Sequence, residues 1–323
     1  MTFFDENSSF PPNQEHEPSS ESPAESSVAS PQPAAALQLE PPLAGDPISL
    51  AATAPTPTSA PITYQPPVPD DLRISWSWPH LILFVFFGFV SFLIVQVTFG
   101  IYYASPLQHL KNQKDIERFV LSKPIFAVGS MVLLYALIIL FLYVTLAVLP
   151  GFPFWRTLGW RKITRPDGRP RSPWLFLLAG GGLSILVFLV TAKMQPHEDV
   201  PIEELFRYKN TALLFMAMAV LVAPLVEETV FRGYLYPLFA KYFGVAASVL
   251  VTGVLFGLMH GAQLGWTWSL VAVLTAVGII FTFVRARTGS VFASFLLHLG
   301  YNSMIALVTV LGTQGFTKMP PGH

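Results

Sequence analysis

From residue 73 onward, long apolar runs alternate with short polar links along the chain. Seven apolar segments follow one another, and most have the roughly 20 residues that an α-helix needs to cross a bilayer. This pattern predicts an all-α fold, a polytopic transmembrane helical bundle. The segments span residues 81–103, 125–149, 174–192, about 212–243, 245–260, 268–284 and 291–311.

The fourth segment is longer than a single crossing requires, and Pro224 interrupts it. Proline removes a backbone donor and kinks or breaks a helix. This segment is therefore either one kinked span or a span followed by a re-entrant helix. The pattern predicts seven or eight membrane helices, and both counts stay open.

Residues 1–72 have a different composition from the rest of the chain. They are rich in Pro, Ser and Ala, and they hold ten acidic residues but no Lys or Arg. Such a segment cannot bury enough apolar surface to offset its ordering entropy. We expect a disordered acidic tail over 1–72, followed by the first membrane helices and a basic loop over 73–204.

Composition narrows the class of protein further. Hydrophobic residues make up 52% and charged residues 12% of the chain, which excludes an ordinary soluble domain. The net charge of zero argues against a nucleic-acid partner. The absence of cysteine excludes disulfides, thiolate metal sites and a cysteine nucleophile.

The link between residues 151 and 173 is the densest basic loop. Because cytoplasmic loops of membrane proteins are enriched in Lys and Arg, we place it, and with it the N-terminal tail, in the cytoplasm. A loop of this kind also contacts anionic lipid, so the bilayer is an expected partner. Its cations are Arg156, Arg161, Lys162, Arg165, Arg169 and Arg171.

The apolar segments contain few charged residues or histidines. Away from the segment ends, the only charged residues are Glu227, Glu228 and Arg232, and the only histidines are His260 and His298. A charge near the bilayer centre costs roughly 3 kcal/mol even on a lenient scale. Three charges on one helix therefore indicate a functional requirement.

Helical spacing assigns different partners to the two glutamates. Glu228 and Arg232 are four residues apart and lie ~40° apart around an α-helix, which favours an ion pair. Glu227 lies ~140° from Arg232, so the arginine neutralises it poorly. We predict one structural carboxylate, Glu228, and one free carboxylate, Glu227, that is available as a general base.

Two further segments supply polar groups. His298 and Asn302 share a helix face and can both donate hydrogen bonds to one developing oxyanion, while His260 lies one turn beyond Phe256. We expect Glu227, His260, His298 and Asn302 to converge in one pocket.

Two histidines, a glutamate and a water could also form a zinc site, with Glu227, His260 and His298 as ligands. The motifs HExxH and GxSxG and the phosphate-binding P-loop are absent.

The strings EETVFRG, FGLMH and HLGYN, in this order, resemble the three motifs of the CPBP intramembrane proteases. That family includes the type II CAAX prenyl endopeptidases and bacterial proteins linked to bacteriocin processing or self-immunity. Its pattern is EExxxR, FxxxH and HxxxN, and no motif position departs from it. The resemblance covers about residues 205–311, which we expect to be a CPBP-like protease core, and leaves 312–323 as a C-terminal tail. The matching residues are Glu227, Glu228, Arg232, Phe256, His260, His298 and Asn302.

The resemblance implies a membrane endopeptidase whose cavity opens to the cytoplasm. Glu227 and His260 would activate a water, and His298 and Asn302 would stabilise the oxyanion. Glu228 and Arg232 would hold the site, and Phe256 would support it. Its substrate would be a peptide or protein at the membrane, and the chain would suit a bacterial plasma membrane. A metal-free and a zinc mechanism both stay open.

Two other functions fit the same residues. An inactive relative could serve as a membrane partner or immunity protein without using Glu227 chemically. A proton-coupled transporter could use Glu227 and the two histidines as a proton relay.

Overall fold

The computed structural model describes residues 69, 72–165, 167–192 and 207–316. Almost all of the predicted tail over 1–72, and residues 317–323 of the predicted C-terminal tail, lie outside the described residues. The described residues form helices, turns and loops, together with one isolated antiparallel β-bridge between Thr164 and Pro170. The longer α-helices are α1 (Trp78–Tyr102), α3 (Gln113–Ser122), α4 (Ser130–Tyr143), α6 (Pro173–Thr191), α8 (Lys209–Leu221), α10 (Tyr236–Met259), α11 (Trp268–Thr288) and α12 (Val291–Gly312).

Shorter elements connect these helices. The short α-helices are α2 (Ala104–Leu107), α5 (Phe154–Thr157) and α9 (Ala223–Glu228). Three π-helical stretches continue from neighbouring helices: η2 (Ile125–Gly129), η3 (Val144–Val148) and η4 (Thr229–Leu235). The π-helix is rare and is often found at functional sites, and η4 follows directly after the two glutamates.

Six helical stretches of the described chain are long and apolar enough to cross a membrane. The all-α membrane fold is thus confirmed, and the chain is an integral membrane protein. The expected count of seven or eight spans is not confirmed. The stretches are Trp78–Tyr102, Ile125–Val148, Pro173–Thr191, Lys209–Met259, Trp268–Thr288 and Val291–Gly312.

The stretch Lys209–Met259 unites the fourth and fifth predicted segments. It has 51 residues, and a straight helix of this length would reach about 75 Å, more than twice the thickness of the hydrocarbon core. The first interruption is at Val222, between α8 and α9, where φ is −97°. Pro224 follows in the first turn of α9, so the break predicted at this proline is present.

The second interruption is a reversal at Gly244. Its φ of 77° and ψ of 166° are non-helical, although helix continues on both sides. Phe231 and Phe256 lie nearly equally far from Gly244 in sequence, and their rings pack edge to face with centroids 5.3 Å apart. The chain thus turns back at Gly244, and the second part of α10 runs beside η4. A backbone of this conformation is essentially restricted to glycine.

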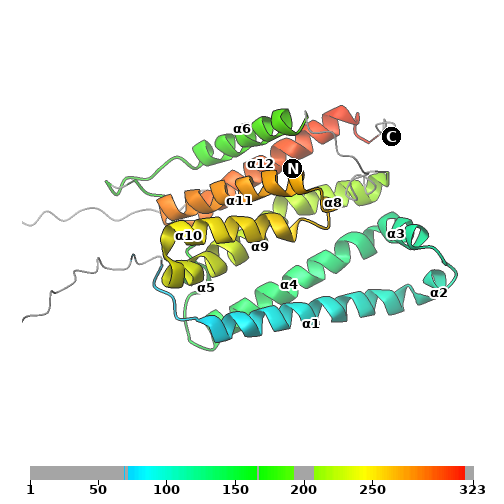
Figure 1. Ribbon diagram of the computed structural model, residues 1–323, viewed down its shortest axis with the longest axis horizontal. Helices are drawn as coiled ribbons and strands as arrows, with labels where there is room; N and C mark the ends of the chain where they lie inside the picture. The colour runs from blue at the N-terminus through cyan, green and yellow to red at the C-terminus, as the bar shows by residue number, and fades with distance from the viewer. Residues whose placement is uncertain (1–68, 70–71, 166, 193–206, 317–323) are drawn as a thin grey trace, which may run out of the picture. The chain divides into compact units, whose positions relative to one another are not determined.

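Small residues set how closely the helices pack. Figure 1 shows α6 beside α12 and α10 beside α11, and both pairs are in extensive contact. A Cβ atom on Gly180 would overlap the Leu297 carbonyl oxygen, and one on Gly257 would overlap the Thr275 side chain. Close approach of this kind is a common way to pack membrane helices. It packs two of the motif-bearing helices, α12 and α10, closely against α6 and α11 respectively.

Candidate active site

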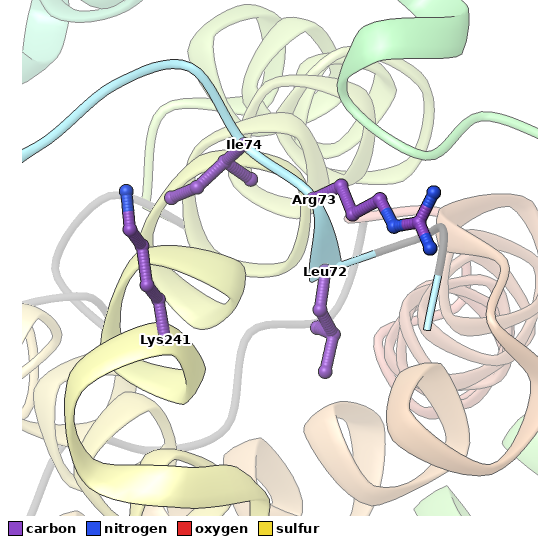
Figure 2. Close-up of a pocket in the computed structure, with 4 residues that line it drawn as sticks. All are labelled: Leu72, Arg73, Ile74 and Lys241. Atoms are coloured by element: carbon purple, nitrogen blue, oxygen red, sulfur yellow. The ribbon is translucent and has the colours of Figure 1, made fainter. Parts of the chain in front are cut away.

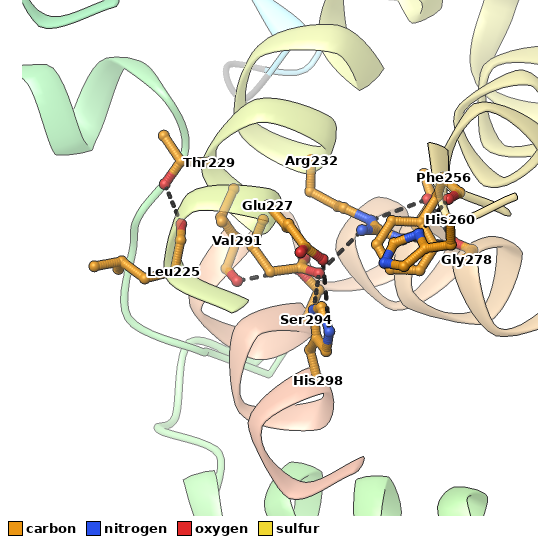
Figure 3. Close-up of polar contacts among 12 residues, drawn as sticks. Leu225, Glu227, Thr229, Arg232, Phe256, His260, Gly278, Val291, Ser294 and His298 are labelled. Carbon is orange, nitrogen blue, oxygen red and sulfur yellow. Dashed lines mark hydrogen bonds and ion pairs between the residues drawn. The ribbon is translucent and has the colours of Figure 1, made fainter. Parts of the chain in front are cut away.

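Glu228 and Arg232 form a fully buried ion pair at the centre of the site. Arg232 Nη1 donates to Glu228 Oε1 over 3.0 Å, and both side chains are 0% exposed. Figure 3 shows the labelled Arg232 beside the Phe256 and His260 side chains. The predicted pairing is therefore present, even though Arg232 lies in the π-helical turn η4 rather than in a regular α-helix.

The same arginine is anchored to α11. Its Nη2 donates to the Gly278 carbonyl over 2.9 Å, and its Nε donates to the Thr282 hydroxyl over 3.2 Å. The guanidinium carbon also lies 4.5 Å from the centre of the Phe256 ring, within the range of a cation–π contact. Arg232 is thus held by three helical elements, which suits a supporting role.

Glu227 has different surroundings. Its side chain is 14% exposed, and Tyr135 of α4 donates its hydroxyl to Glu227 Oε1 over 3.1 Å. Among the described residues, no hydrogen bond or ion pair joins Glu227 to Arg232. Of the two glutamates, Arg232 thus pairs with Glu228, and the role of Glu227 as a general base stays a prediction.

His298 lies between the two glutamates. Its Nδ1 is 3.0 Å from Glu228 Oε1, and its Nε2 is 3.9 Å from Glu227 Oε2. Because a carboxylate only accepts hydrogen bonds, Nδ1 carries the proton that is donated to Glu228. Nε2 is left facing Glu227, and the whole side chain is only 4% exposed. Figure 3 shows the His298 imidazole beneath Glu227.

His260 joins this cluster through aromatic contacts rather than through Glu227. Its Nδ1 lies 2.8 Å from the Phe256 carbonyl oxygen, one turn back in its own chain. The Phe256 ring lies 4.8 Å from the His260 ring and 5.7 Å from the His298 ring, centre to centre. Phe256 thus separates the two imidazoles and fixes their spacing. No hydrogen bond joins His260 to Glu227 among the described residues.

Asn302 points to a neighbouring helix. Its Nδ2 donates to the Ala219 carbonyl of α8 over 2.8 Å. His298 and Asn302 do not share an acceptor within the described part of the chain. Their pairing at an oxyanion stays a prediction.

The three residues offered as zinc ligands do not gather into a metal-binding group. Across residues 72–165, 167–192 and 207–316, no three His, Asp or Glu side chains are placed to share one ion. The Nδ1 atoms of His260 and His298 both face protein acceptors. This leaves both Nε2 atoms open to a ligand, as in metal-bound histidines, and zinc binding stays a prediction of the sequence.

Tyr135 is a site residue that the sequence motifs do not include. It lies within the apolar run of α4, and its hydroxyl is the group that meets Glu227. A buried phenol usually finds a hydrogen-bond partner, which is the one sequence signal that could have pointed to it. Which partner it meets depends on how α4 lies against α9, and spacing along the chain does not contain that information.

A hollow of about 410 Å³ lies apart from the site. It is lined by Leu72, Arg73, Ile74 and Lys241, before α1 and within α10 (Figure 2). None of the motif residues lines it, so the hollow is separate from the cluster around Glu227 and His298.

Comparison with known proteins covers the same region of the chain. Residues 209–304 match a family model described as Rce1-like, type II CAAX prenyl endopeptidase Rce1-like. A search of curated proteins and a search of solved structures each found no match. The matched range includes α8 to α11 and the part of α12 that bears His298 and Asn302. The family predicted from the three motifs is thereby confirmed over residues 209–304 of this membrane protein.

Proposed function

We propose that this protein is an intramembrane endopeptidase that hydrolyses peptide bonds of membrane-associated substrates. One observation carries the proposal: Glu227 has no arginine partner and lies beside an imidazole that Glu228 holds in place. The family match to the type II CAAX prenyl endopeptidases supports the reaction class.

Glu227 is the general base in this proposal. Its Oε2 and His298 Nε2 are 3.9 Å apart, too far for a direct hydrogen bond. A water oxygen about 2.8 Å from each atom can bridge them. Glu227 takes a proton from this water as the oxygen bonds to the peptide carbonyl carbon. When the carbon–nitrogen bond breaks, the same proton passes to the departing amine, so no net proton is lost.

His298 has a fixed orientation in this scheme. Because the Nδ1 proton is donated to Glu228, the unprotonated Nε2 accepts a hydrogen bond from the water, and it can donate to the carbonyl oxygen only when the imidazole carries a second proton. A buried carboxylate that orients an imidazole is the arrangement of hydrolytic triads. Asn302 completes the set as a donor to the oxyanion. His260 completes it as an acceptor from the water, because its Nδ1 proton is donated to the Phe256 carbonyl and its Nε2 is unprotonated. We propose no step through a metal.

Glu228, Arg232 and Phe256 support the site. The ion pair keeps α9 and η4 in register with α11, and Phe256 packs between the guanidinium and both imidazoles. These groups are buried and do not meet the substrate in this scheme. The substrate is a peptide or protein at the membrane, the chain suits a bacterial plasma membrane, and the N-terminal tail is cytoplasmic.

The test is a search for products with purified protein. Wild type and Glu227→Gln are incubated in detergent with a quenched peptide library, and the products are identified by mass spectrometry. The proposal expects new peptide termini with wild type and their loss with Glu227→Gln. Identical products from both proteins would refute it and favour an inactive membrane partner or immunity protein.

Pumping of substrate into liposomes driven by a pH gradient, without peptide products, would instead support a transporter. Adding a chelator and then zinc distinguishes the two mechanisms. The metal-free mechanism predicts no change in the rate of cleavage, whereas the zinc mechanism predicts that cleavage is lost and then recovered.

A further inference from the structure

Trp76, just before α1, and His80, in the first turn of α1, both contact the π-helical turn η4 at a single residue, Tyr234. Trp76 Nε1 donates to the Tyr234 backbone carbonyl over 3.2 Å, and His80 Nδ1 lies 2.8 Å from the Tyr234 hydroxyl. Trp76 and His80 lie outside the three motifs and outside the matched range 209–304. The contacts link residues more than 150 positions apart in the sequence.

A third contact fixes the direction of these hydrogen bonds. His80 Nε2 lies 3.0 Å from the Thr145 hydroxyl oxygen, and that hydroxyl donates its one proton to the Phe141 carbonyl over 2.8 Å. Thr145 must therefore accept from Nε2–H of His80. A neutral imidazole then accepts at Nδ1, so Tyr234 donates to His80. Every proton in the chain Tyr234–His80–Thr145–Phe141 is used.

Tyr234 is close to the site chemistry along the chain. It lies two residues after Arg232 in η4, and it is 0% exposed. The rings of Trp76 and Phe84 lie 5.6 Å and 5.0 Å from its ring, centre to centre. A buried tyrosine that loses its hydrogen-bond acceptor bears the full desolvation penalty of its hydroxyl. The conformation of η4 at Tyr234 therefore depends on α1.

We infer that Trp76 and His80 form a clamp that positions η4 and, through Arg232, the carboxylates of Glu227 and Glu228. His80 is a positioning residue in this arrangement, since it acts through Tyr234 and does not meet the substrate. The effect on catalysis rests on the proposed peptidase function. The clamp itself is a property of the fold and has a readout of its own.

The test compares two substitutions of His80. His80→Gln keeps one acceptor and one donor in a similar arrangement, whereas His80→Leu removes both. Tyr234→Phe breaks the same contact from the other side. Tyr143→Phe is the matched control, because its side chain belongs to α4 and is 47% exposed.

Peptide cleavage is the first readout. His80→Leu and Tyr234→Phe are each expected to lower kcat about tenfold, with KM within about twofold because neither residue meets the substrate. His80→Gln is expected to restore most of kcat, and Tyr143→Phe to leave it unchanged. The double variant, His80→Leu with Tyr234→Phe, is expected to have a kcat no lower than that of either single variant. A His80→Gln protein as slow as His80→Leu, or an unimpaired His80→Leu protein, would overturn the clamp.

Amide hydrogen exchange is the second readout and does not require activity. Exchange over Thr229–Leu235 is expected to accelerate in His80→Leu and to return to the wild-type rate in His80→Gln. Equal exchange in all three proteins would overturn the clamp. If wild type shows no cleavage that depends on Glu227, the proposed function fails, while the exchange experiment still decides the clamp.

Discussion

His298 donates from Nδ1 to Glu228 Oε1 over 3.0 Å, so one carboxylate oxygen accepts hydrogen bonds from both an arginine and an imidazole. Glu228 thus does more than neutralise Arg232. It also turns the other nitrogen of His298 toward Glu227. The two adjacent glutamates are therefore joined through one imidazole, although only one of them is paired with the guanidinium.

Glu228→Gln is expected to destabilise the protein. The substitution leaves Arg232 as an uncompensated charge in a site with no exposure, which costs about 3 kcal/mol or more. The measurement is the free energy of unfolding in mixed micelles. Asp167→Asn is the matched control, because its ion pair with Arg169 is 3.9 Å long and solvent-exposed, and such pairs contribute little. A Glu228→Gln protein as stable as the control would contradict the supporting role.

Tyr135→Phe is expected to slow catalysis without unfolding the protein. The substitution removes one donor to Glu227 and leaves the ring packing of α4 in place. Loss of a single hydrogen bond of this kind predicts a fall in kcat of about three- to tenfold. Steady-state cleavage by Tyr135→Phe, with Tyr143→Phe as control, measures it. An unchanged kcat would show that the phenol does not act on Glu227.

The glycine triplet in α6 offers a test of packing within three consecutive residues. Gly180→Ala places a methyl group against the Leu297 carbonyl, which predicts a loss of about 1–3 kcal/mol in stability. Gly182→Ala meets no atom within 4 Å, and alanine is the better helix former. We therefore expect no loss of stability there. Similar thermal midpoints for the two variants would contradict the close approach of α6 and α12.

Some features follow from the sequence because they are local. The apolar runs locate the membrane helices, Pro224 marks the break before α9, and four-residue spacing identifies the pair Glu228–Arg232. Each depends on residues within one or two helical turns. The reversal at Gly244 falls at the boundary between two predicted segments, although the helical stretch is counted as one.

Other features depend on how distant helices meet. Spacing along α12 places His298 and Asn302 on one face, but it does not reveal that one faces Glu228 and the other Ala219. Tyr135 and His80 lie in the first membrane helices, which the motifs do not cover. Their hydrogen-bond partners are set by the packing between α1, α4 and η4, and the spacing of residues along the sequence does not predict this packing.

The most direct test of the central claim is the rate of peptide cleavage by Glu227→Gln at matched amounts of folded protein. We predict that kcat/KM falls at least about a hundredfold, while the thermal midpoint stays at the wild-type value because Glu227 has no buried cation to lose. Cleavage within about twofold of wild type, at the same sites and with the same fold, would contradict the assignment of Glu227 as the base.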